Sequence, residues 1–179
     1  MGLYSIFTKT GCEDKLLREM KSIWLFDELM HTYAPKYDAL YKKGGKIFKE
    51  QRCSMPGYVF VKSELSGMDF YIKSKPLISW SEYALKLLSY GDSNLDSNFE
   101  MKSDECEIFM KLFSDKGCVD ISKGCIEGDL IIITDGPMVG FEGLIKKVIR
   151  HKMIAYVEVE MLGQITRMKV GLDIVSKKP

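Results

Sequence analysis

Histidine is scarce in this chain of 179 residues, and its five cysteines are irregularly spaced. The two histidines, His31 and His151, lie far apart in the sequence, and no two cysteines are arranged as C-x-x-C. A structural zinc site needs four such ligands close together. We therefore expect no metal centre and no cofactor, and we expect reduced thiols in a cytoplasmic protein.

Long hydrophobic runs are also missing. The longest uninterrupted ones, such as residues 130–133, have the length of a strand, whereas a membrane-spanning helix needs about 18–20 apolar residues. The first residues show no basic region leading into an apolar stretch, so no secretory signal is expected. Apolar residues make up 46% of the chain and charged residues 28%, which is the balance of a globular protein with no membrane partner.

Charge of one sign is not in excess, because 26 Lys and Arg face 25 Asp and Glu. The local distribution is uneven. Residues 36–52 contain six bases and two acids, residues 92–107 contain six acids and one base, and residues 146–152 contain four bases, His151 and no acid. The two basic stretches are candidate phosphate-binding surfaces, and the alternative is that they are ordinary solvated faces.

The first 116 residues show alternating strand and helix patterns. Gly44-Gly45 between extended runs indicates a hairpin within 29–52, residues 82–90 fit either a helix or a strand, and residues 91–98 read as a loop. The order of elements is typical of a split βαβ, ferredoxin-like domain in an α+β protein. The clearest elements are strands at 3–8, 58–61 and 77–80, and helices at 12–25, 66–75 (closed by Pro76) and 103–113.

The pattern changes near residue 117. Glycines recur in a polar stretch there, and after it apolar residues no longer recur at helical spacing. About 55 residues with five short strands favour a small closed barrel, because closure leaves no exposed sheet edges. We predict domains at 1–116 and 124–179, joined by a linker at 117–123. The five strands are expected at 130–134, 143–149, 153–161, 165–170 and 174–175.

The order of motifs resembles the NusG family of transcription elongation factors. The Met55-Pro56-Gly57-Tyr58-Val59-Phe60-Val61 run resembles that family's F-P-G-Y-V-x-V strand, and residues 127–143 look like its KOW motif. Residues 3–13 and 162–175 resemble the opening and closing segments of the family. The resemblance implies an N-terminal ferredoxin-like (NGN) domain and a C-terminal, five-stranded SH3-like barrel (KOW domain). It implies no enzyme activity.

The resemblance also implies that the N-terminal domain binds the clamp coiled coil of bacterial RNA polymerase through an apolar patch. The matching positions are Met55, Tyr58, Phe60 and Trp80. Period-two alternation places Tyr58 and Phe60 on one face of their strand, and we expect the opposite, valine face to be the core.

Departures from the general pattern at 29–52 and 77–91 favour a specialised, LoaP-like antitermination paralogue over the housekeeping factor. Such paralogues are associated with an RNA hairpin in the transcript leader. The strand-forming residues after 130 predict a barrel and not the helical hairpin of RfaH. We expect a monomer whose KOW domain can contact another transcription or translation factor. The bases that suit an RNA ligand are Lys146, Lys147, Arg150, His151, Lys152, Arg167 and Lys169.

Three alternatives stay open at this point. An enzyme using Cys12 or Cys53 is one, although neither has a histidine partner at a readable spacing. A ribosome-associated KOW protein that binds RNA would explain the barrel but not the N-terminal half. The general NusG elongation factor, which modulates pausing and termination, is the third.

Overall fold

The computed structural model describes residues 1–22, 30–91 and 98–178, which form two compact units. The first unit contains residues 1–34, 56–107 and 161–164, and the second contains 35–55, 108–160 and 165–179. The end of the predicted first helix (23–25) and most of the predicted loop at 91–98 fall outside the described residues. The fold is α+β, with three α-helices in the described residues and a larger share of strand.

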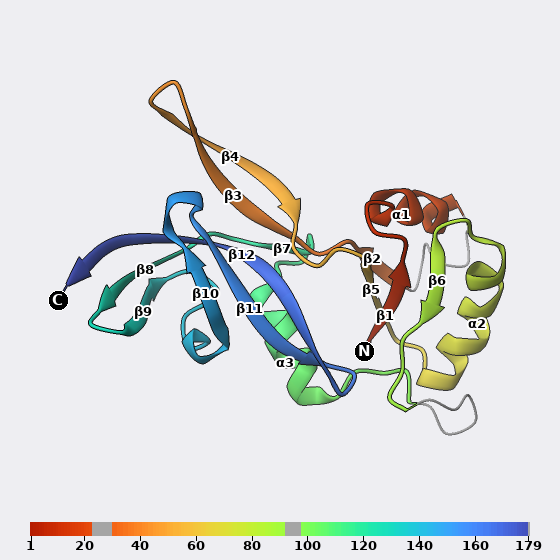
Figure 1. The fold of residues 1–179 in the computed structure, drawn as a ribbon. Helices are drawn as coiled ribbons and strands as arrows, with labels where there is room; N and C mark the ends of the chain where they lie inside the picture. The colour runs from red at the N-terminus through yellow and green to blue at the C-terminus, as the bar shows by residue number, and fades with distance from the viewer. Residues whose placement is uncertain (23–29, 92–97, 179) are drawn as a thin grey trace. The chain divides into compact units, whose positions relative to one another are not determined.

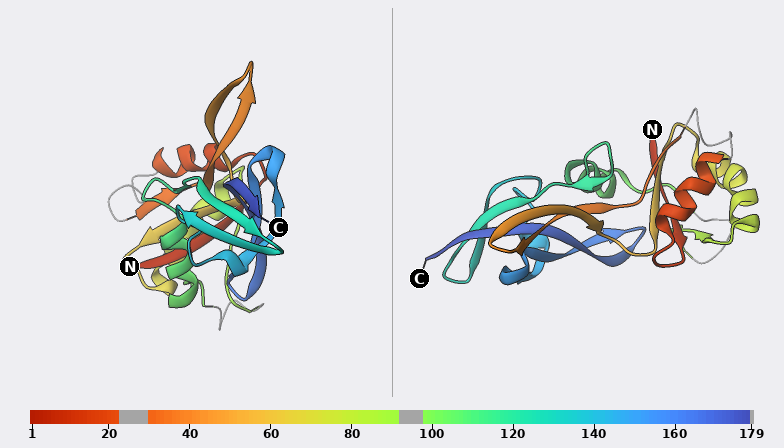
Figure 2. Two further views of the ribbon diagram at one scale, coloured as in Figure 1. Left: turned by 90° about the vertical axis from the view of Figure 1, so that its left-hand side faces the viewer. Right: turned by 90° about the horizontal axis from the view of Figure 1, so that it is seen from above.

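The first unit is built on an antiparallel sheet of order β2-β5-β1-β6, with α1 and α2 packed beside it (Figures 1 and 2). Side chains from the sheet and both helices share one core, in which the Tyr4 ring stacks on Phe70 and Val59 and Val61 are fully buried. The elements are β1 (Gly2–Thr8), α1 (Glu13–Ser22), β2 (Met30–Tyr33), β5 (Tyr58–Ser63), α2 (Gly67–Trp80) and β6 (Ala84–Leu87).

The structure of residues 66–80 differs from the prediction. The helix does not end at Pro76 but continues to Trp80, so the predicted strand at 77–80 is wrong, and β6 supplies the strand instead. Phe70, Ser74 and Leu77 are the buried residues of α2 and recur at helical spacing. Burying Leu77 in the core favours another helical turn, and this outweighs the loss of the one N–H donor that Pro76 lacks.

The predicted hairpin at Gly44-Gly45 is confirmed. Strands β3 (Lys36–Lys43) and β4 (Lys46–Cys53) pair in register along their whole length, from Lys36 opposite Cys53 to Lys43 opposite Lys46. Both turn glycines have positive φ, 58° and 77°, as a two-residue hairpin turn of the right twist requires. The hairpin belongs to the second unit, where β3 also pairs with the short strand β7 (Cys118–Val119).

The second unit also contains a five-stranded sheet of order β10-β11-β12-β8-β9. Strand β8 was not predicted, and β12 is one long strand where two were expected. Gly171 explains the second difference: a Cβ there would lie 2.2 Å from the Asp38 carbonyl oxygen, so this glycine permits a close approach of two backbones and does not end the strand. The elements are α3 (Ser103–Leu112, shared between the units), β8 (Ser122–Glu127), β9 (Leu130–Asp135), η2 (Glu142–Leu144), β10 (Ile145–Ile149), η3 (Arg150–Lys152), β11 (Ile154–Met161) and β12 (Gln164–Lys178).

Across the described ranges, no helix is long and apolar enough to cross a membrane.

Candidate functional surfaces

The four residues predicted to dock on polymerase differ in accessibility. Tyr58 is half-buried, with its ring edge-on to Phe7 at 5.5 Å, and Trp80 is 83% exposed at the end of α2. Met55 and Phe60 are fully buried, and the Phe60 ring lies 5.6 Å from that of Tyr33. The valine face of β5 is core, as predicted, but the implied exposure of Phe60 is wrong, because β5 is buried on both faces at this point.

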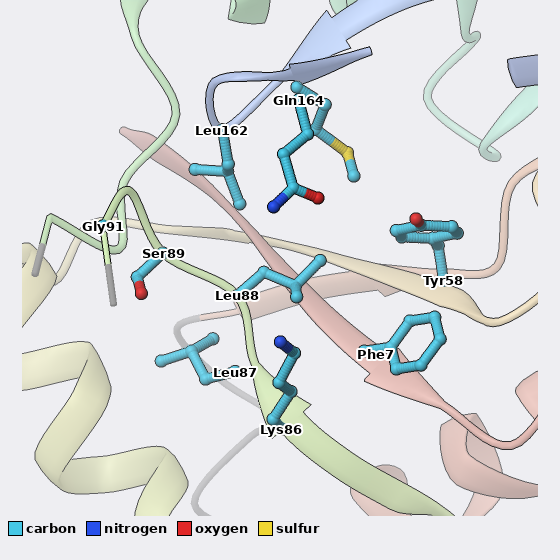
Figure 3. A pocket seen from close by; sticks show the side chains of 10 residues that line it. Phe7, Tyr58, Lys86, Leu87, Leu88, Ser89, Gly91, Leu162 and Gln164 are labelled. Carbon is cyan, nitrogen blue, oxygen red and sulfur yellow. The ribbon is translucent and has the colours of Figure 1, made fainter. Parts of the chain in front are cut away.

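Tyr58 lines a cavity of about 390 Å³ in the first unit, shown in Figure 3. Phe7 and Tyr58 lie next to each other on one side, and Leu162 and Gln164 come from the turn between β11 and β12. Leu87 from β6 adds apolar surface. The cavity therefore combines an aromatic pair and aliphatic side chains with the polar groups of Lys86, Ser89 and Gln164, a lining that suits a partner side chain with both apolar and polar atoms.

A buried carboxylate holds the turn that forms one wall of this cavity. Glu105 on α3 is only 5% exposed and accepts hydrogen bonds from the N–H groups of Leu162 (3.2 Å) and Gly163 (3.4 Å), and from the Tyr90 hydroxyl. Burial, followed by the hydrogen bond to Glu105, raises the pKa of Tyr90 above its ordinary value. Glu105 therefore fixes a turn that contributes Leu162 and Gln164 to the cavity.

A second carboxylate, that of Glu13, holds the turn that precedes Tyr58. Its Oε1 accepts hydrogen bonds from the N–H groups of Gly57 (2.6 Å) and Gly11 (3.1 Å). Gly57 has φ of +87° and directly precedes Tyr58, so the carboxylate fixes the start of β5. Sequence reasoning predicted neither contact: Glu13 was expected only to suit the positive end of the first helix, and Glu105 lies in an acidic segment that reads as solvated.

The predicted RNA-binding bases fall into two groups. Lys146, Lys147, Arg150, His151 and Lys152 are all exposed on β10 and η3, and we call them the basic turn. Met153, with φ of +52°, closes η3 by donating its N–H to the Arg150 carbonyl (3.0 Å). Among the described residues no ion pair joins any of the basic turn to an acid. Its positive charge is therefore available to an external anion.

Arg167 and Lys169 on β12 are engaged within the protein. The Arg167 guanidinium pairs with Glu158 at 2.7 Å, and the Lys169 amine lies 5.8 Å from the centre of the Tyr156 ring. Their charges are thus partly compensated, unlike those of the basic turn.

A thiol lies beside a carboxylate at the base of the β3–β4 hairpin. Cys118 Sγ lies 3.7 Å from the carboxylate of Asp38, which pairs with Lys49 at 2.6 Å. Burial, assisted by Asp38, raises the pKa of Cys118 to about 11. A thiol of this kind stays protonated at neutral pH and is a poor nucleophile. In the described part of the chain, no three His, Cys, Asp or Glu side chains are placed to hold a metal ion.

Comparison with known proteins gives a consistent set of relatives. The chain is 23% identical over 183 residues to the transcription termination/antitermination protein NusG of Rickettsia felis, covering 97% of this chain and 88% of that protein. It is 22% identical to the protein of the same name from Pseudomonas aeruginosa, covering 97% of both. A solved structure described as "Domain interaction in Thermotoga maritima NusG" aligns with 95% of this chain and 93% of that one, at 18% identity. The TM-score is 0.46, which is too low to show a shared fold. Residues 127–160 match the family model of the KOW motif. The chain therefore contains a segment that matches the KOW motif and is similar over most of its length to proteins named NusG.

Proposed function

We propose that this protein is a specialised transcription antitermination factor of the LoaP-like kind, which binds RNA polymerase and a leader RNA and promotes terminator readthrough. The observation that carries the proposal is the similarity to NusG along 97% of the chain, together with an uncompensated basic turn inside the KOW motif. The protein acts as a cytoplasmic monomer without cofactor or enzyme activity.

The proposal assigns residues 1–116 to a ferredoxin-like NGN domain, 117–123 to a linker and 124–179 to an SH3-like KOW barrel. The sheet order β2-β5-β1-β6, with helices following β1 and β5, supports the first assignment. The five-stranded sheet of β8 to β12 supports the second. The KOW barrel can also contact a further transcription or translation factor.

The polymerase contact is proposed at the cavity that Tyr58 and Phe7 line, with Trp80 at the end of α2 as a second exposed aromatic. Aromatic side chains remove a large apolar area from water and are frequent energetic centres of interfaces. Phe60 is buried on the same strand as Tyr58, and Met55 is fully buried as well, so neither side chain is open to a partner. The clamp coiled coil supplies a helix, and helices bind such hollows through apolar residues on one face.

The RNA contact is proposed at the basic turn. Its two types of permanently charged residue, three lysines and one arginine, lie close together in sequence and are exposed, so a folded RNA can contact all four simultaneously. If each contacts one phosphate, a plot of log affinity against log salt should have a slope of roughly −3 to −4. Arg167 and Lys169 contribute less, because Glu158 and Tyr156 already engage them.

The experiment is single-round transcription by bacterial RNA polymerase through an intrinsic terminator, with and without the protein. One template carries the native leader of the neighbouring operon and the other lacks it. We expect readthrough only with the leader. Equal readthrough on both templates would instead identify the general elongation factor, the second candidate, which the names of the curated relatives favour.

A charge-removal variant separates the two contacts. Changing Lys146, Lys147, Arg150 and Lys152 together to Gln should weaken leader-RNA binding at least tenfold and leave polymerase binding unchanged. Unchanged RNA affinity would refute the assignment. The matched control replaces four other exposed lysines with Gln and should keep full RNA affinity: Lys21, Lys75, Lys116 and Lys123.

A further inference from the structure

The turn of the β3–β4 hairpin is strongly basic and fully exposed. Lys42, Lys43 and Lys46 flank Gly44-Gly45, and we call these five residues the basic tip. A Cβ added at either glycine would meet no atom within 4 Å, so nothing in the described part of the second unit packs against the turn. Figure 1 and the left-hand view of Figure 2 show the turn standing clear of the other strands of the second unit.

The base and the tip of the hairpin differ in whether their charges are paired. Towards the base, Lys49 pairs with the buried Asp38, and Arg52 pairs with Glu50. The three lysines of the basic tip have no ion-pair partner anywhere in the described ranges. The hairpin therefore compensates its charge where it joins the fold and leaves three positive charges together at the far end.

This arrangement has a cost for the unbound protein. Lys43 and Lys46 are directly opposite each other in the last pair before the turn, and Lys42 is the next residue along β3. Like charges placed directly opposite across two strands destabilise their pairing. A polyanion bound at the tip would turn this repulsion into attraction.

Exposed apolar side chains follow the tip on both faces of the hairpin: Phe48 shares a face with Lys43 and Lys46, and Ile47 is opposite Lys42 on the other face. Ile47 is 59% exposed and Phe48 is 41% exposed, and the Phe48 ring stacks on Tyr41 with centres 5.5 Å apart. Lysines on an edge strand such as β4 also deter strand pairing between molecules. That role alone does not call for an exposed ring and an exposed aliphatic side chain beside them.

We propose that the basic tip, together with Phe48, is a binding site for single-stranded nucleic acid. The lysines meet successive phosphates, and the exposed face of Phe48 stacks on a base, the combination by which proteins hold single strands without regard to sequence. A duplex fits this site less well, because its base faces are covered by stacking. The site is separate from the basic turn and does not depend on the proposed leader-RNA contact.

The probe is a fluorescein-labelled, twelve-nucleotide single strand of DNA without self-complementarity, titrated with the full-length protein and followed by anisotropy. Three phosphate contacts give an expected log–log salt slope of about −2, so the affinity should fall by about fifteenfold between 50 and 200 mM salt. Lys42→Gln/Lys43→Gln/Lys46→Gln should weaken binding at least tenfold and flatten this slope. The matched Lys→Arg triple variant should bind within threefold of the wild type, because the charge is kept.

The ring is tested separately. Phe48→Ala should weaken binding at least fivefold with the salt slope unchanged, since stacking and not charge is lost. Circular dichroism spectra that match the wild type show that these variants remain folded. The quadruple variant of the basic turn should bind this probe within threefold of the wild type, which distinguishes failure here from failure of the proposed function.

Two results would overturn the inference. One is wild-type affinity for the single strand in the folded Gln triple variant. The other is equal or tighter binding of the corresponding twelve-base-pair duplex, which would show that the tip recognises phosphates on a groove and that base stacking plays no part.

Discussion

Gly136, in the turn after β9, combines a positive φ with backbone atoms that lie too close for a side chain. Its φ is +98°, and a Cβ there would lie 2.6 Å from the Ser122 Cα and 2.9 Å from the Ile121 carbonyl oxygen. Gly140, four residues on, is the matched control: its φ is +81°, but no atom lies within 4 Å of the added carbon. The two sites share the backbone requirement and differ in the close approach.

The expected losses follow from these two terms. Holding an alanine at positive φ costs about 1–2 kcal/mol, and this applies to both Gly136→Ala and Gly140→Ala. At Gly136 the added carbon must also displace backbone atoms, which costs a further 1–3 kcal/mol or so, as overpacking does. We therefore expect Gly136→Ala to lower the free energy of unfolding by about 2–5 kcal/mol, and Gly140→Ala by about 1–2 kcal/mol.

Urea denaturation of the full chain, followed by far-ultraviolet circular dichroism, measures both values under one set of conditions. The wild type and the two variants should share one m-value, so that the midpoints report stability alone. Equal losses in the two variants would refute the reasoning, because the contact with Ser122 would then contribute nothing.

Three further predictions use the same assay. Glu13→Ala should cost about 1.5–3 kcal/mol, because the buried N–H of Gly57 loses a charged acceptor; a loss below 0.5 kcal/mol would show that water replaces the carboxylate. Lys49→Met should cost about 1–2 kcal/mol, a value reduced for the exposure of the lysine, because the Asp38 carboxylate stays buried without its partner; a stability equal to the wild type would contradict this. The pKa of Cys118 is raised to about 11, so the folded state keeps a proton that the unfolded state releases above about pH 9. The thiol's contribution to stability is therefore complete below pH 8 and is lost as the pH rises towards 11, and Cys118→Ala should show a smaller decline between pH 8 and 10.

Sequence reasoning succeeded where the signal was local. Gly44-Gly45 between extended runs predicted the hairpin, because two adjacent positive φ values suit glycine and little else. Alternation separated the two faces of β5, and the valine face, which was expected to be the core, is fully buried. In each case the deciding residues lie within a few positions of one another.

Sequence reasoning failed where distant contacts decided the outcome. Pro76 is a strong local signal for the end of a helix, yet α2 continues because Leu77 has a place in the core. The predicted strands at 165–170 and 174–175 are one strand, because Gly171 lets β12 pass close to Asp38, more than 130 residues earlier in the chain. Nothing near either residue in the sequence indicates these partners.

The cavity proposed to bind polymerase has some features that the sequence indicates locally and others that depend on distant contacts. Its two turns contain Gly57 and Gly163 at positive φ, which is a local signal because such turns favour glycine. The sequence does not indicate the carboxylates that hold these turns, Glu13 and Glu105, because each accepts hydrogen bonds from backbone N–H groups 44 to 58 residues away. An acidic residue is usually solvated, and only the fold brings unpaired N–H groups to it. The walls of the cavity therefore depend on buried charges that composition assigns to the surface, and a search for docking residues should extend from the aromatic side chains to the acids that position them.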